Sequence, residues 1–199
     1  MRWKPFYVSF FLIFSASIPF LPAQEETPIY GSVPDFTFQE RSGKEIHLSD
    51  LNGRVWIADF VFTRCQGQCP LMSSRMSQLQ EPLRTSGVRL VSFSVDPEHD
   101  TPQILSEYAK RFKAEEGIWF FLTGDKQTMW DFIEGSFQLG VAAPTQEDLA
   151  SGAEAVMHSS RFVLVDQKGQ IRGYYDTSES EKMKALIDDA SKLALEKEL

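Results

Sequence analysis

Cysteine, histidine and net positive charge are all scarce in this sequence. Only two cysteines and three histidines occur among its 199 residues, and the formal net charge is −8. An acidic chain lacks the basic face that general nucleic-acid-binding proteins present to phosphates, so we expect no nucleic acid among its partners. Internal repeats and a glycine-rich phosphate loop are missing as well. Hydrophobic residues make up 42% of the chain, which is enough to bury a sizeable core in one domain.

The first 23 residues differ in composition from the rest. Arg2 and Lys4 provide a short basic start, and residues 6–21 are almost wholly apolar and uncharged. This order is typical of a secretory signal peptide. Leu21 fits the usual small-residue cleavage pattern poorly, so an uncleaved membrane anchor through residues 6–21 is the alternative. Under either reading we expect an extracytoplasmic domain, in the periplasm or anchored to the membrane facing it.

The remainder of the chain predicts a polar linker and one α/β domain. Residues 24–34 are polar and contain two prolines, as expected of a linker, and residues 35–199 form the predicted domain. Dense apolar runs at 55–62 and 88–95 are typical of strands buried on both faces. Further strands are expected at 35–38, 46–48, 118–122, 162–165 and 171–175, with helices at 70–84, 101–112, 126–137 and from 179 onward.

The alternation of strands and helices predicts the fold class. Strands that alternate with helices, followed by a hairpin and a closing helix, favour a layered α/β domain. A strand that passes into a helix at a pair of cysteines is the thioredoxin pattern. We therefore expect a thioredoxin-like fold, with a central mixed sheet flanked by helices and an N-terminal β-hairpin extension.

Cys65 and Cys69 lie four residues apart, where the expected strand at 55–62 passes into a helix. Open α/β sheets place their sites at this carboxyl end of the strands. If Cys69 lies in the first helical turn, both sulfurs face the same way, and the helix N-terminus favours thiolates. Arg64 adds a nearby positive charge. A bridge between the two cysteines would close only a small loop and stabilise the fold little, which favours a chemical role.

Two cysteines alone do not separate copper binding from dithiol redox chemistry. Thiolates are the nucleophiles of disulfide exchange and also the soft ligands that suit Cu(I). The usual thioredoxin spacing has two intervening residues rather than three. A structural zinc site usually takes four ligands, and only three plausible ones occur here. An inert bridge or a pair of inert thiols is the remaining alternative.

His158 is the histidine that we expect to act as a ligand. It precedes the expected strand at 162–165, and in a thioredoxin-like domain the loop before this strand lies against the cysteine motif. Two sulfurs and one imidazole nitrogen suit Cu(I), and with an added water or carboxylate they also accommodate Cu(II). His47 and His99 lie in segments that predict surface or packing roles.

Asp96 follows the apolar run at 88–95 and precedes Pro97. An aspartate before proline is typical of a turn, and holding that turn is the role that we favour for Asp96. The alternative is that Asp96 contacts the cysteine site from outside the ligand set and orients a ligand.

Four segments of the chain occur together in one order: residues 59–65 with Cys69 and Pro70, residues 91–98 with 100–102, residues 119–124, and His158-Ser159 with 164–166 and Gly169. In this combination the chain resembles the SCO/SenC family of copper chaperones for cytochrome c oxidase assembly. The resemblance implies a thioredoxin-like fold, with copper held by Cys65, Cys69 and His158. It also implies delivery of copper to, or reduction of the cysteines of, the CuA site in oxidase subunit II. Gln66 departs from the family pattern, which often has proline there.

The sequence thus leads to two hypotheses about function. The first is a copper metallochaperone that binds Cu(I) or Cu(II) through Cys65, Cys69 and His158. It would take part in assembly of the CuA centre, with oxidase subunit II or another copper protein as its partner. The second is an extracytoplasmic thiol–disulfide oxidoreductase that uses Cys65 and Cys69 to reduce the CuA-site cysteines or those of other exported proteins.

Overall fold

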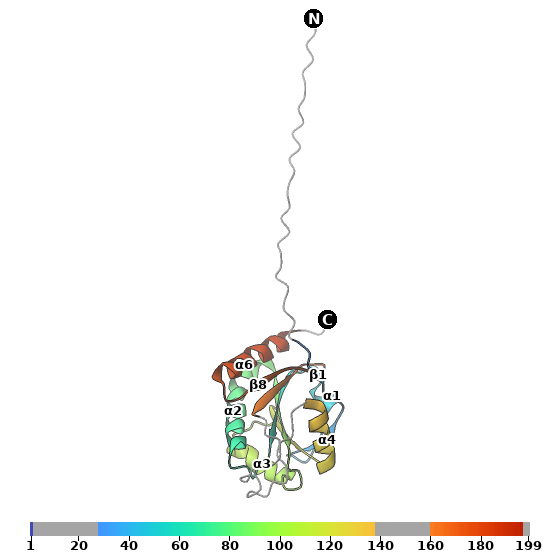
Figure 1. The fold of residues 1–199 in the computed structure, drawn as a ribbon, viewed down its shortest axis with the longest axis vertical. Coiled ribbons are helices and arrows are strands. Elements are labelled where there is room, and N and C mark those ends of the chain that lie inside the picture. Colours follow the sequence, from blue (N-terminus) through green and yellow to red (C-terminus); the bar gives the residue numbers. More distant parts are fainter. Residues whose placement is uncertain (2–27, 138–159, 197–199) are drawn as a thin grey trace.

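Figure 1 shows the fold in a computed structural model, which describes residues 1, 28–137 and 160–196. The expected signal peptide or anchor beyond its first residue, and His158, lie outside the described residues. Within the described part the strands form a single sheet in the order β1-β8-β7-β4-β5-β6-β2-β3. These strands are β1 (Gly31–Ser32), β2 (Thr37–Glu40), β3 (Glu45–His47), β4 (Trp56–Val61), β5 (Arg89–Ser94), β6 (Trp119–Thr123), β7 (Arg161–Val165) and β8 (Gln170–Asp176).

The sheet is mixed, as the sequence predicts. Strands β4, β5 and β6 are parallel neighbours at its centre, and β7 runs antiparallel to β4. The β2–β3 hairpin joins the far side of β6, so the predicted N-terminal hairpin extends the sheet. At the opposite edge, β1 pairs with β8. The two-residue strand β1 lies within residues 24–34, so the sheet begins inside the segment that we expected to be a linker.

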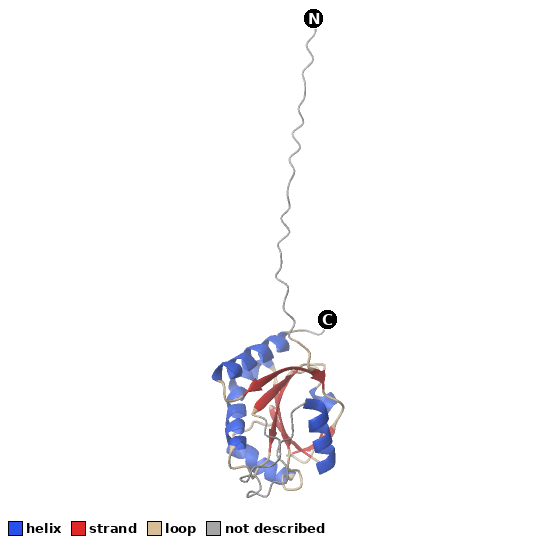
Figure 2. Cartoon of the chain, viewed as in Figure 1, coloured by secondary structure: helices blue, strands red, loops and turns tan. Residues whose placement is uncertain are grey.

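Helices cover both faces of the sheet (Figure 2). In Figure 1, α2 and α6 lie on one side of the strands and α1 and α4 on the other. Apolar side chains of α3 pack in the same core layer as those of α2 and α6. This arrangement confirms the predicted α/β class. The helices are α1 (Leu48–Leu51), α2 (Gln68–Leu83), the 3₁₀ turn η1 (Arg84–Ser86), α3 (Pro102–Arg111), α4 (Lys126–Phe137) and α6 (Ser180–Leu195).

Helix α2 begins at Gln68, two residues before the predicted start at Pro70. Proline is tolerated within a first helical turn because the N–H groups there have no partner inside the helix. Pro70 therefore lies inside the first turn and does not mark its beginning. The earlier start brings Cys69 into that turn.

Phe93 of β5 lies at the centre of the core layer beneath α4. Its side chain is fully buried, because the central strand is covered on both faces. Rings from the hairpin, from β4 and from α4 surround it at centroid distances between 5.3 and 6.3 Å. These neighbours are Phe36, Phe38, Trp56, Phe60, Phe132 and Phe137. Phe93 thus joins the hairpin to the central sheet and to α4.

We expect Phe93→Ala to lower the free energy of unfolding by about 3 to 5 kcal/mol, because the surrounding rings cannot close the cavity. Urea denaturation followed by circular dichroism measures this change. Leu71→Ala, at a side chain that is 57% exposed, is the control and should have little effect. A loss below about 1 kcal/mol for Phe93→Ala would contradict the central role of that ring.

Candidate functional site

The parallel pairing of β4 and β5 determines where the site lies. Val61 is opposite Ser94 in the ladder, so the loops that follow the two strands leave the sheet at the same edge. The first loop carries the cysteines and the second carries Asp96. Strand β7 is antiparallel to β4, with Ala58 opposite Val163, and therefore begins at this edge.

The two cysteines meet at the start of α2. Gly67 is the N-cap residue, and Cys69 lies in the first turn. The backbone N–H of Cys69 donates a hydrogen bond to Sγ of Cys65, with an N···S distance of 3.4 Å. The two sulfurs are not bridged, and Cys65 is half-buried whereas Cys69 is only 7% exposed. The helix N-terminus thus directs a donor at the more exposed sulfur, which favours negative charge there.

The Cys69 thiol holds its proton strongly. A hydrogen bond with the side chain of Cys65 is the main cause that raises the pKa of Cys69 above its usual range. Burial and the charge on Cys65 raise it further, and Asp59 adds a smaller contribution in the same direction. The two thiols therefore differ: Cys65 is placed to meet a reactant first, whereas Cys69 must lose a tightly held proton before it can react.

Asp100 connects the loop before Cys65 to the loop after β5. Its fully buried carboxylate accepts hydrogen bonds from the N–H of Thr63, at 3.2 and 3.3 Å, and from the Thr63 hydroxyl at 2.6 Å. The hydroxyl of Ser94 donates to the same carboxylate at 2.8 Å, and Nδ1 of His99 lies 3.2 Å from it. The sequence did not identify this role, because an acid before Thr101-Pro102 resembles a helix cap. Thr101 is the N-cap residue of α3.

Asp96 closes the turn after β5, as favoured from the sequence, and its carboxylate contacts Arg64 of the cysteine loop. Its backbone carbonyl accepts hydrogen bonds from the N–H groups of His99 and Asp100, which closes the turn. Its carboxylate accepts from Nε of Arg64 at 3.0 Å, and a second guanidinium nitrogen forms an ion pair with it. Asp96 thus reaches the cysteine motif through the residue that precedes Cys65.

Polar atoms of Asp96, His99 and Asp100 also lie within 4.8 Å of one another. Their carboxylates already accept hydrogen bonds from Arg64, Thr63 and Ser94. The Arg64 guanidinium supplies positive charge at this point, so we assign the cluster to holding the two loops together.

Asp59 of β4 is a fully buried carboxyl group beneath this site. The hydroxyl of Ser92 donates a hydrogen bond to its Oδ1, while Oδ2 has no partner among the described residues. Burial raises the pKa of Asp59 from 3.8 to about 7, against the Ser92 hydrogen bond, which lowers it. Asp59 is the one acidic residue in the apolar run at 55–62. Its position there was a signal of an unusual buried group that we did not predict from the sequence.

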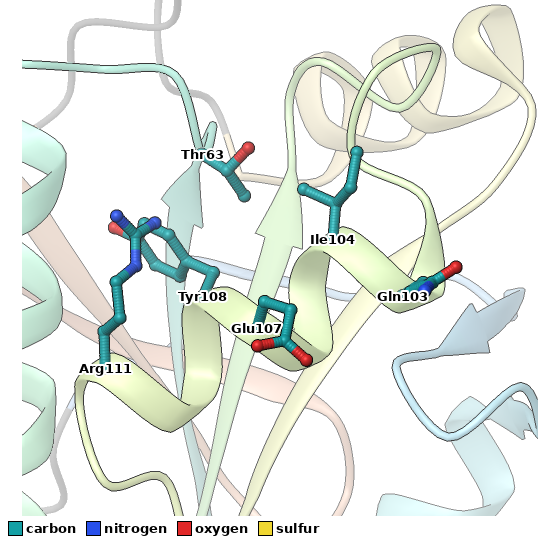
Figure 3. A pocket seen from close by; sticks show the side chains of 6 residues that line it. All are labelled: Thr63, Gln103, Ile104, Glu107, Tyr108 and Arg111. Atoms are coloured by element: carbon teal, nitrogen blue, oxygen red, sulfur yellow. The ribbon is translucent and has the colours of Figure 1, made fainter.

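A pocket of about 420 Å³ opens beside the loop that precedes Cys65 (Figure 3). One face of α3 forms most of its lining. The Tyr108 hydroxyl lies 2.8 Å from the hydroxyl of Ser73 on α2, and the Arg111 guanidinium lies over the Tyr108 ring. The lining residues are Thr63, Gln103, Ile104, Glu107, Tyr108 and Arg111.

The position of His158 and the expected membrane segment are not settled by the described residues. His158 lies outside the described residues, so its position relative to the cysteines stays a prediction. In the described ranges, none of the helices has the length and apolar character that crossing a membrane requires.

Comparison with known proteins identifies relatives along nearly the whole chain. A model of the SCO1/SenC family matches residues 24–194. The SCO1 protein homolog of Bacillus subtilis is 38% identical over 83% of this chain and 84% of its own length. A Stutzerimonas stutzeri protein named for copper binding is 29% identical over 82% of this chain and 75% of its own length.

A solved structure shares the fold. It is that of BsSco, a member of the Sco family of cytochrome c oxidase assembly proteins in which a disulfide switch was identified. The TM-score is 0.74 at 34% identity, over 87% of this chain and 100% of that one. The likeness confirms the predicted thioredoxin-like fold class.

The buried acid makes stability depend on pH. Because the pKa of Asp59 rises from 3.8 to about 7 on folding, the folded state binds the proton more tightly between those values. The free energy of unfolding should therefore fall as pH rises through this window. At the acidic end of this window we expect Asp59→Asn and the native chain to have the same free energy of unfolding. At higher pH the free energy of unfolding of Asp59→Asn should be the larger, by at most about 4 kcal/mol.

Urea denaturation from about pH 4 to about pH 8 measures this difference. Asp188→Asn removes an exposed carboxylate and should follow the native curve. If Asp59→Asn showed the same pH dependence as the native chain, the buried carboxyl would not titrate as described.

We expect Asp100→Asn to lower the free energy of unfolding by about 1 to 3 kcal/mol, because an amide group replaces an oxygen that accepts from Thr63 or Ser94. The loop before Cys65 should also loosen, so Cys65 should react faster with iodoacetamide. Unfolding curves and alkylation rates measure the two effects, again with Asp188→Asn as the control. An alkylation rate equal to that of the native chain would show that Asp100 does not hold this loop.

Proposed function

This chain belongs to the SCO1/SenC family, and from that membership we propose that it is a copper chaperone in cytochrome c oxidase assembly. Copper is its cargo, and Cys65, Cys69 and His158 are the proposed ligands. The observation that carries the proposal is the position of the two thiols. They lie together in the first turn of α2 and just before it, at the sheet edge where β4 and β5 end.

The donor set fits the metal. Two thiolates are soft ligands that favour Cu(I), and an imidazole completes a set that also tolerates Cu(II). Strand β7 begins at Arg161, three residues after His158, and its antiparallel pairing with β4 starts it at the cysteine edge. This short separation along the chain between His158 and the start of β7 supports His158 as the third ligand. The relative that is named for copper binding supports copper as the metal.

The proposed partner is subunit II of the oxidase, at its CuA site, or another copper protein. The family match begins at residue 24, directly after the apolar N-terminal segment. This supports residues 1–23 as a signal peptide or membrane anchor, 24–34 as the connection to the domain, and 35–199 as the copper-binding domain. The proposed location is therefore extracytoplasmic, in the periplasm or at the membrane facing it.

A second candidate is a thiol–disulfide oxidoreductase that reduces the CuA-site cysteines. The unequal environments of the two thiols favour it, because Cys65 is accessible while Cys69 is buried and protonated, as in a pair that attacks and then resolves. The disulfide switch in BsSco is in keeping with such chemistry. Copper and a disulfide compete for the same sulfurs, so the two activities exclude each other at any one moment.

We expect His158→Ala to weaken Cu(I) binding by at least about 100-fold, because loss of a ligand exceeds the effect of losing a residue that orients one. Competition with a chromophoric Cu(I) chelator measures the affinity. Titration of the reduced protein with Ellman's reagent should still find both thiols. His99→Ala is the matched control, and its copper affinity should stay near that of the native chain.

Unchanged copper affinity in His158→Ala would show that the three-ligand site is wrong. The reductase candidate has its own test, which uses an oxidised CuA domain as substrate. A reduced chain that leaves the disulfide of that domain intact would eliminate the second candidate and leave the first standing.

A further inference from the structure

The end of the sheet that lies away from the cysteines is where the chain enters the domain. Strand β4 begins and β7 ends here, and the N–H of Val33, directly after β1, donates to the carbonyl of Gly169 in the turn after β7. Gln167 of this turn accepts from the N–H of Gly53, just before β4, and donates through Nε2 to the carbonyl of Leu193 in the last turn of α6. Figure 1 shows β1 and the end of α6 at this end of the domain and α3 at the other. We call it the entry end.

Basic side chains gather at the entry end, although the chain carries a net charge of −8. Arg54 lies just before β4, and Arg89 begins β5. Lys168 lies in the turn at 166–169, and Lys192 in the last turn of α6. Within residues 28–137 and 160–196, none of these four side chains forms an ion pair with a carboxylate.

The two arginine side chains converge on Gly87. Nη1 of Arg89 donates to the Gly87 carbonyl at 3.3 Å, and a side chain at Gly87 would begin only 3.7 Å from Nη1 of Arg54. Burial chiefly lowers the pKa of Arg89, and the charge of Arg54 lowers it further, so each guanidinium feels the charge of the other. Two like charges held together in this way favour an anion that contacts both, and guanidinium groups suit the oxygens of phosphate.

Exposed apolar side chains lie at the same end. Ile29 is 58% exposed, Tyr30 is 50% exposed and Leu195 is 81% exposed. The N–H of Tyr30 donates to the carbonyl of Ile171 near the start of β8, and Leu195 ends α6. Apolar and tyrosine side chains beside cations suit the boundary between lipid headgroups and acyl chains.

The chain that precedes the domain brings the entry end near a membrane. Only the seven residues 22–28 separate the apolar segment at 6–21 from Ile29. Seven residues span at most about 25 Å even when fully extended. If residues 6–21 are the proposed anchor, the entry end is therefore held within reach of the lipid headgroups.

We propose that the entry end is a docking surface for the headgroups of anionic phospholipids in the membrane that holds the chain. Arg54 and Arg89 contact lipid phosphate, while Lys168 and Lys192 add positive charge around them. The exposed apolar side chains reach the boundary of the acyl chains. The inference rests on the anchor in the proposed function and adds the surface on which the domain lies.

The cysteine end of the domain fits an anionic surface poorly. Only two cations, Arg64 and Lys126, pair with the carboxylates of the described loops after β5 and β6. These carboxylates are those of Asp96, Glu98, Asp100 and Asp125. The six residues of β4 span about 20 Å between the two ends. The proposed copper site therefore points away from the membrane, toward the domain of a partner protein.

The test is hydrogen–deuterium exchange of the full chain in lipid nanodiscs, followed by mass spectrometry. One set of nanodiscs contains phosphatidylcholine alone, and the other also contains phosphatidylglycerol. The apolar segment is the same in both sets, so a difference in exchange reports the headgroup charge. Amides of 52–54 and 166–170 should exchange at least about fivefold more slowly on the anionic nanodiscs, which is the effect of a single basic side chain at such a surface.

Amides of 63–71 should exchange equally on both. Raising the salt concentration from about 0.1 M to about 1 M should remove the slowing, because salt screens the attraction.

Arg54→Glu combined with Lys168→Glu should abolish the slowing, because both side chains are exposed and their reversed charges are repelled. Arg54→Gln combined with Lys168→Gln should weaken it without adding negative charge. The matched control is Lys182→Glu combined with Lys184→Glu, at two exposed positions near the start of α6. It changes the net charge as much as the first variant does and should keep the slowing.

Equal exchange of 52–54 and 166–170 on the two kinds of nanodisc, with the chain retained on both, would overturn the proposal in favour of an acidic protein surface as the partner. Slowing that survives in Arg54→Glu with Lys168→Glu would also overturn it, as would slowing at 63–71. Release of the chain from the neutral nanodiscs would instead show that the anchor is wrong, and the inference would fall with it. The assay contains no copper, so its result is independent of the proposed ligands.

Discussion

The parallel pairing of β4 with β5 is the constraint on which the site depends. It brings the loop that carries the cysteines and the loop that carries Asp96 to the same edge of the sheet. Asp100 then joins these loops through the backbone N–H and hydroxyl of Thr63. Because the carboxylate is fully buried, its acceptor positions are filled by protein donors and not by solvent. This connection holds the loop that leads to Cys65 against the loop that follows β5.

Charge is distributed unevenly around the two thiols. The first turn of α2 directs the Cys69 N–H at the sulfur of Cys65, and Arg64 adds a cation that Asp96 holds in position. Beneath the motif the only described carboxyl on the strand is Asp59, which is buried and incompletely hydrogen-bonded. The helix N-terminus thus favours negative charge on the outer sulfur, while the inner sulfur holds its proton strongly, chiefly through its hydrogen bond with Cys65. A pair built in this way can react in sequence.

Copper binding and dithiol exchange have one requirement in common. Each removes the protons of both thiols, and each therefore meets the same obstacle at the buried sulfur. A site that allows both thiols to lose their protons therefore meets this requirement of copper binding and of dithiol exchange alike. The chain belongs to the SCO1/SenC family, and the solved structure of BsSco, in which a disulfide switch was identified, shares its fold.

The sequence alone determined the elements whose signals are local. Helix α4 has the predicted bounds 126–137, and the apolar runs at 55–62 and 88–95 became β4 and β5, because apolar periodicity lies within each segment. The cysteine pair was likewise visible from its spacing. Only the tertiary structure decided the strand β1, the Asp100 connection and the Asp59 oxygen that has no partner among the described residues. Each of these depends on contacts between residues far apart in the chain, which no local pattern records.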